Sequence, residues 1–189
     1  MNDNSINLHN AVLLKKEQVS IAAALLAKAF QNDPWNCYVF PEEIDRKRRN
    51  PAVFTSFIEY TLRVGEVWTT GEPLKGVSLW FSPKSDENNP EYLKESGLDN
   101  LPLLMGEEAA ERYEQYERSM EVLRQQAVPD PHWYLSVIGV DPEWQGFGIG
   151  GALLKPVLER ADRSRAYCYL ETSLPNNLSY YPLVKTTSP

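Results

Sequence analysis

The sequence has few of the features that mark secreted, membrane or metal-binding proteins. It contains only two cysteines, Cys37 and Cys168, so it has no disulfide framework and a cytoplasmic location is expected. The longest apolar run, residues 21–27, is far too short to span a membrane, and the first ten residues do not resemble a signal peptide. This short run predicts no membrane partner. No set of His, Cys and acidic residues has metal-ligand spacing, so no metal is expected either.

Basic residues are also in the minority. The chain has 19 Lys and Arg against 26 Asp and Glu, which gives a net charge of −7. Because a nucleic-acid-binding domain usually carries a basic face, this balance argues against nucleic acid as a partner. The length of 189 residues and the 42% of hydrophobic residues fit one core. We therefore expect a single domain over residues 1–189.

Hydrophobic periodicity predicts mixed secondary structure in the first two thirds of the chain. The expected elements are a strand at 12–14, a helix at 17–30, a solvated helical segment at 42–49, a separate helix from Pro51 to about 64, strands at 66–69 and 76–81, a loop at 84–90, and a helix at 107–126. The apolar stripe of this last helix either packs on the core or belongs to a lid or an oligomer contact. Its many glutamates are interpreted as a solvated face.

Four glycines in six residues, Gly146 to Gly151, join the last two predicted strands. The order is a strand at 132–140, the glycine segment, a helix at 148–161 and a strand at 167–171, which together form a βαβ unit. Glycine costs regular structure roughly 0.5–1 kcal/mol relative to alanine, so the cluster indicates a sharp bend or a close approach to a ligand. Gly139 inside a strand predicts a bulge or a close backbone approach. Pro156 is expected to kink or loosen the helix.

The glycine segment satisfies the dinucleotide fingerprint G-x-G-x-x-G, and Glu171 stands where a ribose-binding acid would follow. Two observations argue against that interpretation. Residues 141–145 separate the strand from the first glycine, and too few residues follow Gly151 for the further βα units of such a domain. A tight turn without a ligand is the simpler alternative.

A longer pattern fits better. The run from Gln145 to Gly150 matches (R/Q)-x-x-G-x-(G/A), follows a strand and opens an apolar helix. It resembles motif A of the GNAT superfamily of acyl-CoA-dependent N-acyltransferases, and residues 170–173 (LETS), Asn177 and Tyr181 resemble a later pattern of the same family. The N-terminus of a helix offers unpaired N–H groups and a partial charge of about +0.5, which suits a pyrophosphate.

The resemblance implies an α+β, three-layer α/β/α fold with a mixed, mostly antiparallel sheet and an acetyl-CoA-binding core at about 132–181. It implies acetyl-CoA as cosubstrate, held by Ile138, Gly139, Val140, Gln145, Gly146, Phe147, Gly148, Ile149, Gly150, Gly151 and Asn177. It also assigns Tyr181 as the general acid that protonates the leaving thiolate, with the adjacent Tyr180 as the alternative. The general base is not identifiable from the sequence. His132 is interpreted as structural rather than catalytic, Glu171 either holds a water or only caps the structure, and Cys168 is interpreted as a core residue.

The expected function is N-acetyl transfer from acetyl-CoA to a primary amine of a small molecule or peptide, by direct attack in a ternary complex. Family members usually continue beyond the tyrosine into a closing hairpin, which this sequence lacks. The alternative is therefore a non-catalytic acyl-CoA-binding or regulatory module with a degenerate acceptor site. Because a bare sheet edge promotes aggregation, we also expect a homodimer that covers the edge near residues 167–171.

Overall fold

The computed structural model describes residues 10–86, 89–129, 131–173 and 177, which contain a five-stranded sheet in the order β1-β2-β3-β4-β5. Its strands are β1 (Ala11–Leu13), β2 (Gly65–Thr70), β3 (Gly76–Phe81), β4 (His132–Val140) and β5 (Tyr167–Leu170). Neighbouring strands are antiparallel except for β4 and β5, which are parallel. The mixed, mostly antiparallel sheet predicted from the sequence is confirmed.

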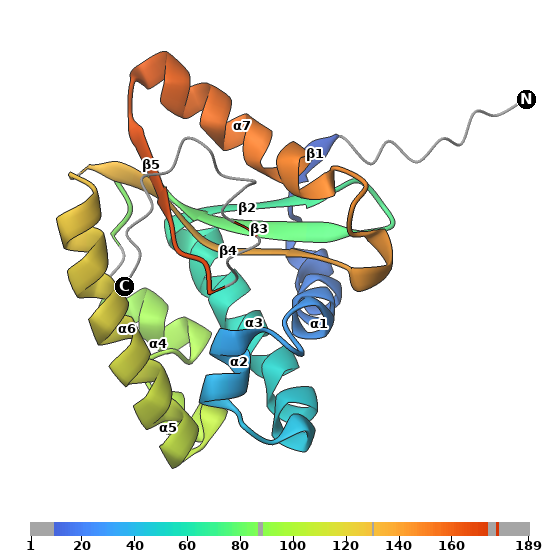
Figure 1. Cartoon of the computed structure of the whole chain (residues 1–189), viewed down its shortest axis with the longest axis vertical. Helices are drawn as coiled ribbons and strands as arrows, with labels where there is room; N and C mark the ends of the chain where they lie inside the picture. Colours follow the sequence, from blue (N-terminus) through green and yellow to red (C-terminus); the bar gives the residue numbers. More distant parts are fainter. Residues whose placement is uncertain (1–9, 87–88, 130, 174–176, 178–189) are drawn as a thin grey trace, which may run out of the picture.

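Helices cover both faces of this sheet (Figure 1). The described helices are α1 (Val19–Ala29), α2 (Pro34–Val39), α3 (Glu43–Val64), α4 (Pro90–Ser96), α5 (Leu101–Met105), α6 (Glu107–Ala127) and α7 (Ile149–Ser164). Successive residues of a strand point to opposite faces. Leu79 of β3 accordingly packs in the core beneath α1 and α3, whereas Trp80 packs with Val157 of α7. The three-layer arrangement follows from this alternation.

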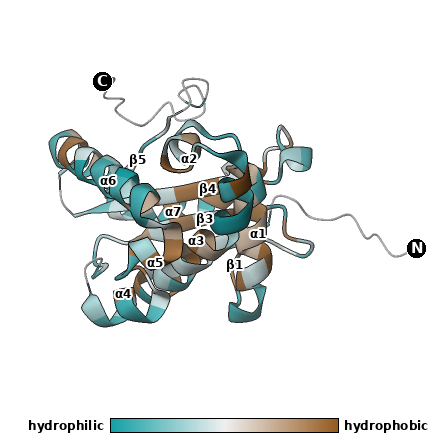
Figure 2. Cartoon of the chain, turned by 90° about the horizontal axis from the view of Figure 1, so that it is seen from below, coloured by the Kyte–Doolittle hydropathy of each residue, from teal (hydrophilic) through white to brown (hydrophobic). Residues whose placement is uncertain are grey.

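A second apolar cluster lies away from the sheet and joins α2, α3, α5 and α6. Val39, Phe40, Val53, Met105 and Ala109 are buried in it. Figure 2 shows α6 as a largely hydrophilic helix beside the strongly hydrophobic β4. The predicted packing of the α6 stripe is confirmed for its first turns. Among the residues that the structure describes, a helix with the length and hydropathy of a membrane span is not found.

The helix boundary predicted at Pro51 is wrong, because α3 runs without interruption from Glu43 to Val64. Proline removes one backbone hydrogen bond, but α3 has buried residues both before and after Pro51, and their packing stabilises the continuous helix. Before Pro51, the buried Arg46 donates from Nη1 to the carbonyl oxygens of Phe40 and Pro41, both at 2.6 Å. The segment 42–49 is therefore anchored to the body rather than wholly solvated.

Two short helices, α4 and α5, were not predicted. Both follow an asparagine N-cap with a proline in the first turn, a combination that favours helix initiation. Asn89 Oδ1 accepts from the backbone N–H groups of Glu91 (3.1 Å) and Tyr92 (3.3 Å), and Asn100 Oδ1 accepts from that of Leu103 (3.2 Å). These helices are too short for hydrophobic periodicity to reveal them.

Candidate active site

Strands β4 and β5 share only a short stretch of pairing. Their register runs from His132 opposite Tyr167 to Leu135 opposite Leu170, and β5 ends there while β4 continues to Val140. On the other side of β4, the register with β3 shifts at Ser136. The second half of β4 therefore has no β5 partner along residues 136–140, and this part of the strand borders a cavity.

The irregularity expected at Gly139 lies instead at Ser136, because Val137 pairs with Leu79 while Leu135 pairs with Trp80. Gly139 has a different reason to be glycine. A Cβ atom there would lie 2.7 Å from Leu26 Cδ2 and 3.1 Å from Phe30 Cε2 of the helix α1 region. The close approach predicted at Gly139 is thus confirmed, and its neighbours are side chains of the protein.

The glycine segment forms the turn between β4 and α7. Gly146 and Gly148 have φ angles of 83° and 79°, in the left-handed region that glycine adopts without strain, and Gly148 is the N-cap of α7. Gln145 Nε2 donates to the carbonyl oxygen of Val140 (3.2 Å), which ties the turn back to the strand. A Cβ atom added at Gly150 or Gly151 would meet no atom within 4 Å.

The open space beside these glycines has the properties of an anion site. The first N–H groups of a helix have no intrahelical acceptor, and the helix dipole adds positive potential at the same end. Glycine lets a phosphate approach these groups closely. The α7 N-terminus therefore fits the pyrophosphate that the sequence pattern predicted.

The cavity has a volume of about 1680 Å³ and runs from the glycine turn along β4 to α1, α3 and α6. It brings together most of the predicted cofactor-binding residues: Ile138, Gly139, Val140, Gln145, Gly146, Gly148, Ile149, Gly150, Gly151 and Asn177. Phe147 does not line it; that side chain is 58% exposed and packs on Trp144. Tyr180 and Tyr181 lie outside the described residues, so their predicted role stays a prediction.

The end of the cavity away from the glycine turn is walled by aromatic rings, and we call this end the acceptor chamber. Trp35 of α2 contacts the rings of Tyr113 (6.2 Å between centroids) and Tyr116 (6.3 Å) of α6, and Phe57 of α3 lies 5.9 Å from Tyr113. The ring of Phe30 extends the wall toward α1. The α6 helix, whose stripe packs on the body, therefore also supplies one side of the cavity.

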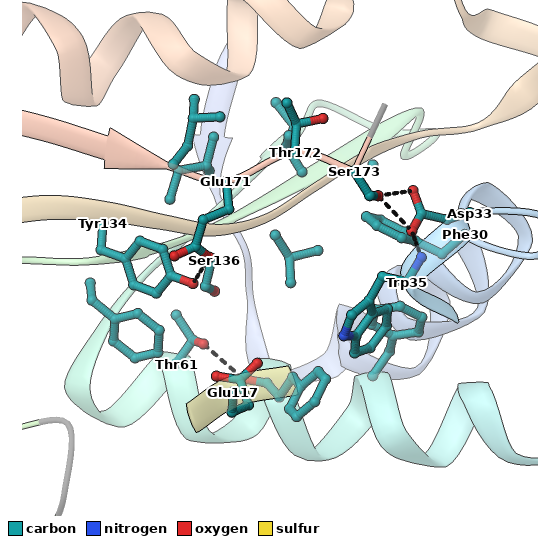
Figure 3. A pocket seen from close by; sticks show the side chains of 18 of the residues that line it. Phe30, Asp33, Trp35, Thr61, Glu117, Tyr134, Ser136, Glu171, Thr172 and Ser173 are labelled. Atoms are coloured by element: carbon teal, nitrogen blue, oxygen red, sulfur yellow. Dashed lines mark hydrogen bonds between the residues drawn. The ribbon is translucent and has the colours of Figure 1, made fainter. Parts of the chain in front are cut away.

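Five acidic residues line the cavity, and three of them, which come from different elements, are labelled in Figure 3: Asp33, Glu117 and Glu171. Asp33 caps α2 by accepting from the Trp35 N–H (2.9 Å) and from Ser173 Oγ (3.3 Å), and burial raises its pKa. Glu171, just after β5, accepts from Tyr134 Oη (3.0 Å), and burial raises its pKa as well. Both carboxylates thus accept hydrogen bonds from neighbouring groups of the protein.

The third carboxylate, Glu117 of α6, lines the cavity, and its side chain is exposed there. Desolvation at this position, together with the nearby charge of Glu171, raises the pKa of Glu117 to about 7. Figure 3 shows Glu117 opposite Thr61 and across the chamber from Tyr134. A carboxyl group that titrates near neutral pH is suited to exchange protons with a ligand.

Sequence reasoning missed Glu117 because it assigned the glutamates of this helix to a solvated face. Its only distinguishing signal is its spacing, because it follows Tyr113 by four residues and therefore lies on the same side of the helix as Tyr113. His132, which was interpreted as structural, packs edge-on against Tyr169 (6.0 Å). Burial raises the pKa of the Cys168 thiol to about 11, which supports its interpretation as a core residue.

Comparisons with known proteins agree with this architecture. Residues 110–181 match the model of the acetyltransferase (GNAT) family. The chain is 28% identical over 173 residues to an uncharacterized N-acetyltransferase of Schizosaccharomyces pombe, covering 85% of this chain and 67% of that protein. That relative aligns with far more of the chain than the family model does.

Solved structures show the same fold. The chain resembles the crystal structure of histone acetyltransferase HPA2 and related acetyltransferase from Corynebacterium glutamicum, with a TM-score of 0.63, 20% identity, and coverage of 92% of this chain and 81% of that one. It also resembles arylalkylamine N-acetyltransferase 2 from Aedes aegypti, with a TM-score of 0.57, 14% identity, and coverage of 92% and 80%.

The matched residues 110–181 contain β4, the glycine turn, α7 and β5, which border the cavity. This part of the chain is similar to the acetyltransferase (GNAT) family, a family that uses acetyl-CoA as cosubstrate, and the fold resembles that of the solved acetyltransferase structure from Corynebacterium glutamicum.

Proposed function

We propose that this protein is an N-acetyltransferase, and that it moves the acetyl group of acetyl-CoA to a primary amine of a small molecule or peptide by direct attack in a ternary complex. The observation that carries the proposal is the continuous cavity, which joins the glycine turn to a chamber of aromatic and acidic side chains. One end of it suits a phosphorylated cosubstrate and the other suits an amine. Because both ends open into one space, donor and acceptor can be bound together.

At the donor end, the backbone N–H groups of residues 146–151 hold the pyrophosphate. The unpaired part of β4, residues 138–140, offers backbone groups to the pantetheine arm, which would take the place of a fifth-strand partner. Acetyl-CoA supplies an acyl group on a thiolate leaving group, so the protein has to position it, activate the amine and exclude water.

At the acceptor end, the wall composition favours a positively charged amine with an apolar body. The rings of Trp35, Tyr113 and Tyr116 present aromatic faces and edges, and aromatic faces attract cations. The carboxylates of Glu117 and Glu171 add negative charge to the same chamber. The chamber also argues against the alternative of a binding module with a degenerate acceptor site.

The proposal is tested by measuring thiol release from acetyl-CoA with a panel of primary amines, alongside direct binding of coenzyme A. We expect turnover with cationic amines that carry an aryl or alkyl body, and weak turnover with anionic amino acids. Binding of coenzyme A without turnover of any amine would support the non-catalytic module instead.

A further inference from the structure

We propose that Glu117 of α6 is the general base of the acetyl transfer, and that it takes the proton of the acceptor ammonium inside the acceptor chamber. This inference rests on the amine acetylation proposed above and names the residue that makes the amine nucleophilic. The base was not identifiable from the sequence, because β4 carries no acid and α6 presents many similar glutamates.

The position of Glu117 is the first argument. Its side chain lies in the chamber rather than on the outer face of α6, between the aromatic wall of the same helix and Thr61 of α3 (Figure 3). A cationic amine that contacts the rings of Tyr113 and Tyr116 is therefore next to this carboxylate. Glu114, one turn earlier, does not line the cavity and pairs instead with Arg118 at 3.6 Å.

The competing carboxylates are less able to take up and release a proton. Asp33 accepts two hydrogen bonds that fix the α2 N-terminus and Ser173, and losing its charge would weaken both. Glu171 is half-buried and accepts from the Tyr134 hydroxyl. Glu117 is more exposed to the cavity than either of them, so a proton that it receives can leave to solvent.

The charges around Glu117 favour a proton acceptor that works at neutral pH. Desolvation raises the pKa of Glu117 most, the charges of Glu171 after β5 and of Glu121 on the same helix raise it further, and Arg124 lowers it. Arg124 also ion-pairs with Glu121 and lies 4.4 Å above the Tyr134 ring of β4, so its charge is shared. The hydroxyls of Tyr113, Tyr116 and Tyr134 also interact electrostatically with Glu117, and burial raises the pKa of each. Arg118, the next residue of α6, lines the same cavity.

The proton balance is complete without any further reactant. The ammonium loses one proton to Glu117, and the neutral nitrogen attacks the thioester carbonyl. The C–S bond breaks, the nitrogen loses a second proton and the coenzyme A sulfur gains one, which leaves an amide and a free thiol. Glu117 then returns its proton to solvent, so one proton is released for each turnover.

The pH dependence of kcat/KM tests this assignment with the Glu117→Gln variant. With an acceptor amine of pKa about 10, the unmodified protein should reach a plateau above pH about 7, because the carboxylate is then ionised. The variant should be about 100-fold or more slower near pH 7. Its rate should keep rising toward the pKa of the amine, because only the free amine then reacts.

Two controls separate chemistry from structure. Glu114→Gln makes the same charge change on the same helix outside the cavity and should keep the plateau. A weakly basic primary amine such as trifluoroethylamine, largely unprotonated at neutral pH, needs no base and should be acetylated by Glu117→Gln at close to the unmodified rate.

The possible failures are distinguishable. An unchanged plateau in Glu117→Gln, or an equal loss with both amines, would overturn the role of Glu117 while leaving amine acetylation intact. If the unmodified protein acetylates no amine at all, the proposed function falls, and the assignment of the base falls with it.

Discussion

Glu117 carries a cost in stability that a glutamate on the outer face of the same helix does not. A carboxyl group whose pKa is raised by folding binds a proton more tightly in the native than in the unfolded state. Placing it in the chamber therefore disfavours its charged form, which is the form that a base requires. A residue that weakens the fold at neutral pH is easier to explain by its chemistry than by packing.

The first prediction at this scale concerns the stability of Glu117→Gln. Between pH 4.5 and about 7, the unfolded state has already lost the proton that the native state keeps, so the unmodified protein loses stability as pH rises through this window. Glutamine does not titrate, so the variant should melt at a higher temperature than the unmodified protein at pH above about 7. Thermal unfolding across this range measures the difference.

The advantage of Glu117→Gln should disappear below pH 4.5, where the carboxyl is protonated in both states. Glu114→Gln serves as the reference, since it removes an exposed charge. A difference in melting temperature that is the same at every pH would show that the environment of Glu117 does not raise its pKa.

Among the elements, the βαβ unit was the most predictable part of the molecule. The sequence patterns of these segments indicate their structure without reference to the rest of the chain: the apolar run of β4, the glycines, and the helical stripe of α7. The turn, the helix and the parallel pairing were therefore all predicted. The continuity of α3 was not anticipated, because a proline signals a helix start in the sequence, while hydrophobic periodicity does not reveal the contacts of Arg46 with the carbonyl groups of Phe40 and Pro41.

The acceptor chamber was predictable only in part. Its aromatic residues were visible as the stripe of α6, but their partners Trp35 and Phe57 come from α2 and α3, and no local pattern brings the three helices together. The role proposed for Glu117 depends on this packing of α2, α3 and α6 around the chamber. A site assembled from several elements in this way emerges only with the tertiary structure.

The prediction at the scale of elements concerns the glycine turn before α7. Gly150→Val should fold normally, because its Cβ has free space within 4 Å, and should weaken coenzyme A binding by more than tenfold, or about 1.4 kcal/mol, since the side chain fills the phosphate site. Titration calorimetry with coenzyme A measures this. Gly148 is a poorer probe, because its φ of 79° would strain a valine whether or not a ligand binds.

Gly71→Val provides the matched control, since Gly71 also has no atom within 4 Å of an added Cβ and lies outside the cavity. It should bind coenzyme A as the unmodified protein does. Equal affinity in a folded Gly150→Val would show that the pyrophosphate does not lie at this turn.

In the molecule as a whole, the sheet and the second apolar cluster support different ends of the cavity. The sheet with α1, α3 and α7 gives the donor end its rigid frame, whereas α2, α5 and α6 build the acceptor chamber around their own cluster. The two bodies share α3, which contributes Phe54 and Ile58 to one core and Val53 to the other. The long uninterrupted α3 is therefore what fixes the chamber relative to the glycine turn.

The homodimer expected from the sequence stays a prediction, and the described sheet shows where to test it. In the part of the chain that the structure describes, β5 pairs only with β4, and Tyr167 on it is 60% exposed. An edge strand presents unpaired N–H and C=O groups, which a second subunit can cover. We expect a dimer by sedimentation at micromolar concentration, and slow exchange of the β5 amides that face away from β4.

Tyr167→Lys should shift this dimer toward monomer, because an edge lysine opposes strand pairing. The matched control is Leu13→Lys on β1, the opposite edge of the described sheet, where Leu13 is 55% exposed; it should leave the dimer intact. If Leu13→Lys alone dissociates the dimer, the interface lies at β1. A monomer whose outward β5 amides exchange quickly would show that this edge stays uncovered in solution, and the dimer would then be ruled out.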